Sequence, residues 1–97
     1  VTPIISETLS IETDLSSYDN KDLISISGKS DVSNVVNLSI ENQNNELVWA
    51  EQVSIKNNGQ YSTLAIAGGS GWETSGTYTI IVNNGNEINS STFSFTA

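Results

Sequence analysis

The sequence predicts one all-β domain, a sandwich of about seven antiparallel strands. Short segments in which apolar and polar residues alternate recur along the chain, and turns rich in Asn and Gly separate them. Ser, Thr and Asn are abundant, a composition that favours strands and turns, and no segment has the periodicity of a helix. The length of 97 residues matches what a single sandwich of this kind needs.

The first half of the chain provides three of the expected strands. Residues 1–7 contain the only proline and are expected to form a linker or edge segment, so that the domain spans residues 8–97. A first strand follows from Leu9 and Ile11, which alternate with polar residues. The other two are Leu23–Ser27, preceded by an Asp-Asn turn, and Asn34–Asn42, which has the cleanest alternation in the chain.

Four more strands are expected in the second half, and each is bounded by a turn or a glycine. They are Leu47–Ile55, Tyr61–Ala67, Gly76–Val82 and Asn89–Thr96. Glu51 interrupts the apolar face of the first of these, so we expect a bulge near residues 50–52. The side chains expected to point into the core are Ile24, Ile26, Val36, Leu38, Ile40, Leu47, Trp49, Val53, Ile55, Leu64, Ile66, Tyr78, Ile80, Val82, Phe93 and Phe95.

Composition excludes several classes of function. Eleven acidic residues against three lysines give a net charge of −8, which argues against nucleic acid as a partner because phosphate contacts need clustered cations. The same charge keeps a protein soluble and can gather cations such as Ca²⁺. Cys, Met and His are absent, so thiol and imidazole chemistry and the usual zinc and copper sites are excluded. No apolar segment is long enough to insert into a membrane.

Four segments resemble immunoglobulin-like modules. Gly76-Thr77-Tyr78-Thr79 is similar to the motif that opens the penultimate strand of such modules, and the turn and strand over residues 18–28 are similar to an earlier one. Together with residues 58–61 and 92–95, they resemble domains of extracellular proteins of ammonia-oxidising archaea, including surface-layer proteins. The resemblance covers residues 14–97 and implies an immunoglobulin-like β-sandwich at the cell surface.

The turn before the second strand is a candidate cation site. Asp19, Asn20 and Asp22 offer oxygen ligands at a spacing that Ca²⁺ could use. Asp and Asn also stabilise turns by bonding to their own backbone, and this alternative stays open. Asp14 and Asp31 would complete the site if the fold brought them close.

Two sequons are candidate glycosylation sites. Asn37 and Asn89 each begin an Asn-x-Ser tripeptide, and Asn37 is expected to face solvent. An exported protein could carry glycans there, although such tripeptides arise by chance in a chain so rich in Asn and Ser.

Aromatic and acidic residues suggest two further sites, which we weigh against simpler roles. Trp49, Trp72 and Tyr61 could line a carbohydrate platform, but core packing is favoured because a sandwich needs large side chains. A pair of carboxylates could serve glycoside hydrolysis, but a sandwich of this length lacks loops to build a cleft. The pairs considered are Glu46 with Glu51 and Glu73 with Glu87.

We therefore expect a non-catalytic structural module of an extracellular cell-surface assembly, a surface layer or filament, whose partners are sister domains or copies of the same protein. No cofactor is expected beyond Ca²⁺. The alternative is a binding or adhesin module that recognises a glycan or protein through loops at one end. In a variant of the first hypothesis, residues 1–11 pair with the sheet of a neighbour.

Overall fold

A computed structural model describes residues 9–30 and 34–97, which form two packed β-sheets. The predicted linker at residues 1–7 and the candidate ligand Asp31 lie outside the described residues. The strands are β1 Glu12–Thr13, β2 Ser17–Asp19, β3 Leu23–Lys29, β4 Val35–Glu41, β5 Leu47–Ser54, β6 Gln60–Ile66, β7 Gly76–Asn83 and β8 Ile88–Thr96.

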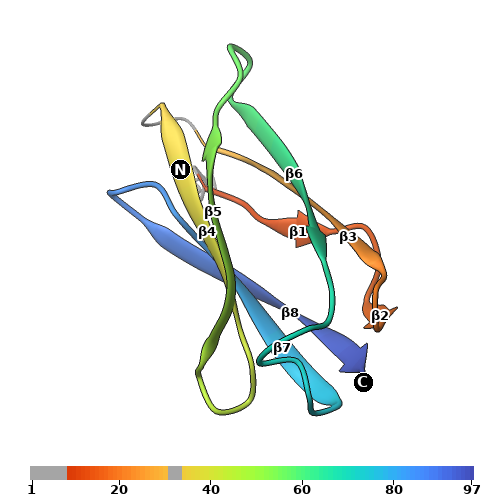
Figure 1. Cartoon of the computed structure of the whole chain (residues 1–97). Coiled ribbons are helices and arrows are strands. Elements are labelled where there is room, and N and C mark those ends of the chain that lie inside the picture. Colours follow the sequence, from red (N-terminus) through yellow and green to blue (C-terminus); the bar gives the residue numbers. More distant parts are fainter. Residues whose placement is uncertain (1–8, 31–33) are drawn as a thin grey trace, which may run out of the picture.

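The two sheets confirm the predicted sandwich (Figure 1). One has three strands in the order β1-β3-β6, and the other has five in the order β2-β8-β7-β4-β5. The described residues thus contain eight strands rather than seven, because Ser17–Asp19 forms a short strand that the sequence analysis took for part of a turn region. This β2 strand pairs parallel with β8, whereas the other pairs are antiparallel.

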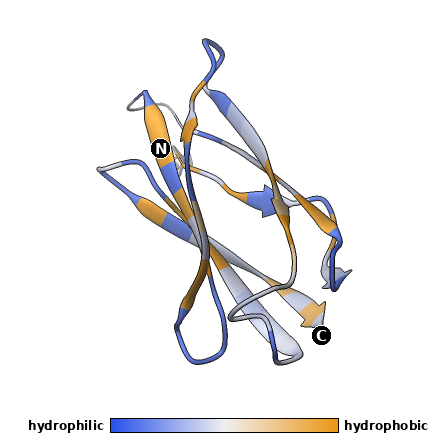
Figure 2. Cartoon of the chain, viewed as in Figure 1, coloured by the Kyte–Doolittle hydropathy of each residue, from blue (hydrophilic) through white to orange (hydrophobic). Residues whose placement is uncertain are grey.

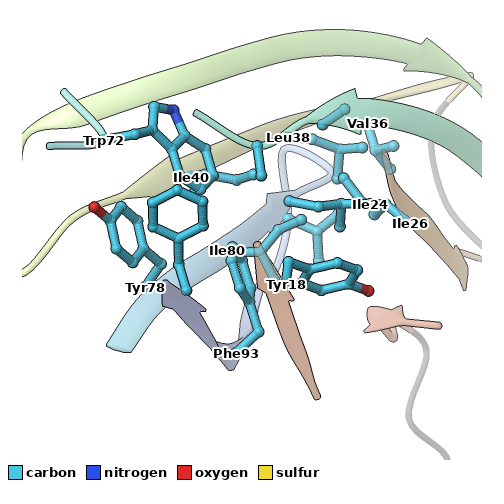
Figure 3. Packing of buried hydrophobic residues seen from close by; sticks show 14 of the residues in the cluster. Tyr18, Ile24, Ile26, Val36, Leu38, Ile40, Trp72, Tyr78, Ile80 and Phe93 are labelled. Carbon is cyan, nitrogen blue, oxygen red and sulfur yellow. The ribbon is translucent and has the colours of Figure 1, made fainter. Parts of the chain in front are cut away.

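The core lies between the sheets, with Trp72 and Tyr78 toward one end and Val36 and Ile26 toward the other (Figure 3). The Trp72 ring stacks on the Tyr78 ring at 4.7 Å, and Phe95 meets both rings edge to face. Aromatic pairs in these geometries add to the stabilisation that burial provides. The buried apolar residues are Leu9, Tyr18, Ile24, Ile26, Val36, Leu38, Ile40, Tyr61, Ala65, Ala67, Trp72, Tyr78, Ile80, Val82, Phe93 and Phe95.

The orientation of β6 differs from the prediction, which placed Leu64 and Ile66 in the core. Both side chains are exposed, and Tyr61, Ala65 and Ala67 point inward instead. Tyr61 fixes this choice, because its buried ring lies over Gly28, where any side chain would collide with it. A shift by one residue would expose this ring and turn the opposite face of β6 inward, since side chains alternate along a strand.

The bulge in β5 lies nearer its start than predicted. Pairing with β4 jumps from Trp49 to Leu47, so Val48 is the extra residue, and Leu47 is exposed rather than in the core. From Trp49 onward the register with β4 is regular, and Glu51 lies opposite the buried Leu38. Glu51 therefore belongs to the inner face of this edge strand, and no bulge is needed at residues 50–52.

Each end of the sandwich contains a buried asparagine that organises a hairpin. The Asn42 side chain accepts hydrogen bonds from the backbone N–H groups of Asn44 and Glu46 and donates one to the carbonyl of Gly71. At the other end, Asn84 accepts bonds from two N–H groups of its own turn and donates to Ser30 Oγ. The turns that these side chains hold are strongly hydrophilic (Figure 2).

Candidate functional site

The candidate cation site at residues 19–22 is a tight turn. The N–H of Asp22 donates to the carbonyl of Asp19, and Lys21 adopts a φ of 75°. The Asp22 carboxylate is engaged, since its Oδ2 accepts the backbone N–H of Asp19 at 2.8 Å. Asn20 lies against Gly68, and the turn is joined to the end of β6 by hydrogen bonds with Ala67. These contacts account for the three residues as parts of a turn, and the calcium hypothesis stays a prediction.

Asp14 has a structural role away from that turn. Its Oδ1 accepts a hydrogen bond from the hydroxyl of Tyr18 at 2.5 Å and another from the N–H of Ser25 at 3.2 Å. The bond from Tyr18 holds the pKa of the Asp14 carboxyl below its usual value. Among residues 9–30 and 34–97, no three acidic side chains gather in an arrangement that would hold a metal ion.

All three tyrosines attach a loop or strand end to the core through their hydroxyl groups. Besides the bond from Tyr18 to Asp14, Tyr61 donates to the carbonyl of Ser10 at 2.5 Å, and Tyr78 donates to that of Thr74 at 2.7 Å. Burial raises the pKa of each of these phenols. A tyrosine at the start of the penultimate strand that bonds to backbone a few residues upstream is the tyrosine corner of immunoglobulin-like sandwiches, and Tyr78 has this geometry.

The aromatic residues considered for a carbohydrate platform do not share a surface. Trp72 and Tyr61 are buried, and Trp49 is half-buried against the core. The indole N–H of Trp72 donates to the carbonyl of Val48 at 3.4 Å, which holds the ring inside. The preferred interpretation of these residues as core is therefore confirmed for Trp72 and Tyr61.

The two sequons lie in different surroundings. Asn37 is exposed on the outer face of β4, where its Oδ1 accepts a hydrogen bond from Gln52 at 3.3 Å. Asn89 is half-buried, and its Nδ2, the atom to which a glycan would attach, donates to the carbonyl of Leu9 at 2.9 Å. Of the two predicted glycosylation sites, Asn37 is the more accessible.

The candidate carboxylate pairs do not face each other across a cleft. Glu73 and Glu87 flank opposite ends of β7, so the length of an eight-residue strand, roughly 25 Å, separates them. Glu46 accepts a bond from Asn42 in its hairpin, and Glu51 accepts one from Thr63 on the other sheet. No pocket is found on the surface formed by residues 9–30 and 34–97.

One surface feature was not expected from the sequence, a cluster of large apolar side chains on the outer face of the three-stranded sheet. Leu23 is directly opposite Ile66, and Ser25 is opposite Leu64. Leu23, Leu64 and Ile66 are 56%, 58% and 63% exposed. We call these three residues the outer apolar patch. The alternation of residues predicted β6 as a half-buried strand correctly, but it did not reveal which face of β6 was buried.

The two outer faces of the sandwich differ in chemistry. On the five-stranded sheet, the outer face carries opposed polar pairs such as Thr79 with Thr92 and Asn37 with Gln52, and its exposed apolar residues Leu47 and Ile88 lie on strands that do not pair with each other. Contiguous apolar patches on a soluble domain often mark an interaction surface. The outer apolar patch is accordingly our candidate functional site.

Comparisons with known proteins support the fold alone. No family model and no curated protein matches the chain. Among solved structures, trypsin-activated alpha-2-macroglobulin from Escherichia coli superimposes with a TM-score of 0.74 at 14% identity, covering 91% of this chain and 6% of that one. The sulfur carrier protein SoxY from Chlorobium limicola f thiosulfatophilum has a TM-score of 0.48 at 13% identity, covering 95% of this chain and 82% of that one.

The class of protein follows from the fold. The chain is an all-β domain with an immunoglobulin-like sandwich, which the strand order, the tyrosine corner and the similarity to alpha-2-macroglobulin support together. The chain corresponds to a small part of that much longer protein. Within the described residues, no helix has the length and apolar character needed to cross a bilayer.

Proposed function

We propose that this domain is a non-catalytic structural module of an extracellular cell-surface assembly, and that it packs against a sister domain through the outer apolar patch. The observation that carries the proposal is the exposure of Leu23, Leu64 and Ile66 side by side on one sheet. The five-stranded sheet also has exposed apolar side chains, Leu47 and Ile88, but these lie on strands that do not pair with each other, so they form no comparable cluster.

The area of the outer apolar patch favours packing against a neighbouring module of the same chain or lattice over binding of a free partner. Covering the three side chains would remove roughly 300 Å² of apolar surface, which corresponds to about 7 kcal/mol. A stable interface between separate proteins buries about 800 Å² on each partner, so this smaller contact alone would not hold two free copies together. It would suffice between modules of one chain or lattice, where the effective concentration reaches the millimolar range.

The net charge of the domain makes the proposed assembly depend on salt. Two copies that each carry a net charge of −8 repel each other at low ionic strength. Cations screen that repulsion over about 10 Å at 0.1 M salt, and a cation bound near residues 19–22 would reduce it further. The proposed assembly is therefore stronger in the presence of salt or Ca²⁺.

The location at a cell surface is supported by the resemblance of residues 14–97 to immunoglobulin-like domains of archaeal extracellular and surface-layer proteins. On the same ground, we propose that the sister domains are modules of this kind. The exposed sequon at Asn37 suits an exported protein that carries a glycan on its polar sheet.

A covalent tandem of two copies tests the packing. We expect the tandem to melt at a higher temperature than the single domain, with an increment that grows with salt and disappears in Leu64→Ser. Leu47→Ser is the matched control, because Leu47 is 63% exposed but lies on the other sheet. A tandem that melts with the single domain under all salt conditions would contradict the proposal.

The calcium part has a separate test. If residues 19–22 bind Ca²⁺, millimolar Ca²⁺ raises the melting temperature of the single domain more than Mg²⁺ does, and Asp22→Asn removes the difference. Equal effects of the two cations would leave these residues with their role in the turn alone.

A further inference from the structure

The chain passes through the sandwich from one end to the other. Leu9 lies beside Ser30 and accepts a hydrogen bond from Asn89, close to the turn between β7 and β8. At the opposite end, the N–H of Ala97 donates to Ser75, immediately before β7 begins. The longest dimension of the domain is 46 Å, and β8 runs along the sandwich toward the C-terminus (Figure 1).

The strand β2, near the start of the described residues, pairs in parallel with β8, the last strand of the chain. Ser17, Tyr18 and Asp19 of β2 lie opposite Ser94, Phe95 and Thr96 of β8, and the N–H of Ser94 donates to the carbonyl of Ser16 at 2.9 Å. Side-chain packing reinforces this pair, because the buried Tyr18 ring meets Phe93 edge to face at 5.4 Å.

This geometry determines how a pulling force would act. A force that separates the two chain ends pulls β2 toward the Leu9 end and β8 toward the Ala97 end, along their axes and in opposite directions. Because this force acts along the strand axes, it loads the bonds between β2 and β8 together rather than one after another. The strands must slide past each other, and sliding would also drag the Tyr18 ring out of the core.

We propose that the β2–β8 pair is a mechanical clamp that makes this domain a load-bearing module along its own chain. The pull must first part residues 9–14 from β3, to which they are joined by the Leu9–Ser30 bridge, the β1–β3 pairs and the bonds Ser10 N to Lys29 O and Asp14 N to Ser25 O. The clamp then carries the load. This inference needs neither the outer apolar patch nor a cell-surface location, because it rests on topology alone.

The pulling direction provides the first test, in single-molecule force spectroscopy of the natural domain. Handles at the two chain ends shear the β2–β8 pair, whereas handles at Asn20 and Ala97, both at the same end of that pair, open it bond by bond. Forced unfolding reports the barrier along the pulled direction, and we expect the rupture force in shear to be at least about twofold higher. Equal forces in the two directions would overturn the proposal.

A pair of proline variants on β8 provides the second test. Ser94→Pro removes the donor to Ser16 O, whereas Ser90→Pro removes an N–H that bonds only the side chain of Asn89. Both serines are exposed and lie on the same face of β8. We expect Ser94→Pro to lower the end-to-end rupture force and Ser90→Pro to retain it, with melting curves confirming that each variant folds.

Failure of this test is distinguishable from failure of the proposed function. Leu64→Ser, which disrupts the outer apolar patch, is expected to leave the end-to-end rupture force of a single domain unchanged. If Ser90→Pro and Ser94→Pro weaken the domain equally under load, the clamp is contradicted, whatever the tandem experiment shows.

Discussion

Replacing Tyr78 by Phe removes one hydroxyl group and leaves the stacked ring in place, so it isolates the tyrosine corner. The lost interaction is the 2.7 Å hydrogen bond from the hydroxyl to the carbonyl of Thr74. A hydrogen bond of this kind contributes about 0.5–1.5 kcal/mol, and the freed carbonyl belongs to an exposed residue, so water can replace the donor. We therefore expect a loss of about 1 kcal/mol in the free energy of unfolding.

For a domain of this length, that loss corresponds to a fall of about 5 °C in melting temperature, measurable by circular dichroism or calorimetry. Thr74→Ala is the control, because it keeps the backbone carbonyl and alters an exposed side chain. Tyr78→Ala would cost about 3–5 kcal/mol, since it also removes the ring that Trp72 stacks upon. If Tyr78→Phe melted with the natural chain, the corner would not stabilise this sandwich and the reasoning would be refuted.

Three other predictions concern the surface and the ends of the sandwich. Tyr18→Phe destabilises the domain at neutral pH, and the difference from the natural chain narrows in acid. The reason is that the pKa of Asp14 is lower in the folded state than its unfolded value near 3.8, so its contribution is present above that pH and is lost as the pH falls through the folded value. Glu51→Val removes an inward-pointing charge from an edge strand, so sedimentation is expected to show concentration-dependent association through β5. Asn42→Ala leaves hairpin donors without their acceptor and lowers the free energy of unfolding by about 2 kcal/mol in denaturant titrations.

Matched variants decide each of these outcomes. Glu51→Lys keeps a charge on the inner face of this edge strand and is expected to remain monomeric, so association of both variants would show that the charge does not protect the edge. Asn44→Ala keeps the N–H that Asn42 accepts and serves as the control at the hairpin. A constant difference between Tyr18→Phe and the natural chain across the acid range would show that Asp14 does not depend on that hydroxyl.

Most strands could be predicted from the sequence because alternation of apolar and polar residues is a local signal. Residues 35–41, 76–83 and 88–96 were recognised almost to their ends, since one face of each is apolar and the other consists of polar groups. The tyrosine corner could also be expected, because the resemblance around Gly76-Thr77-Tyr78-Thr79 placed a tyrosine at the start of the penultimate strand.

The remaining features depend on contacts distant in sequence. In β6, both faces carry apolar residues, and only the fit of Tyr61 over Gly28 decides that Leu64 and Ile66 face outward. The short β2 strand has one buried residue, Tyr18, and parallel pairing leaves no local pattern that would identify β8 as its partner. The outer apolar patch was not predicted because the sequence does not show which face of β6 is buried. The β2–β8 clamp was not predicted because parallel pairing leaves no local pattern.

A nuclear Overhauser map of the aromatic and methyl protons tests the sandwich most directly. We expect the Ala65 methyl group to give contacts to side chains of the core, the Trp72 and Tyr78 rings to contact each other, and Tyr18 to contact Phe93. Contacts from Leu64 or Ile66 methyl groups to that core, with the Tyr61 ring turned to water, would contradict both the register of the sheets and the interaction surface derived from it.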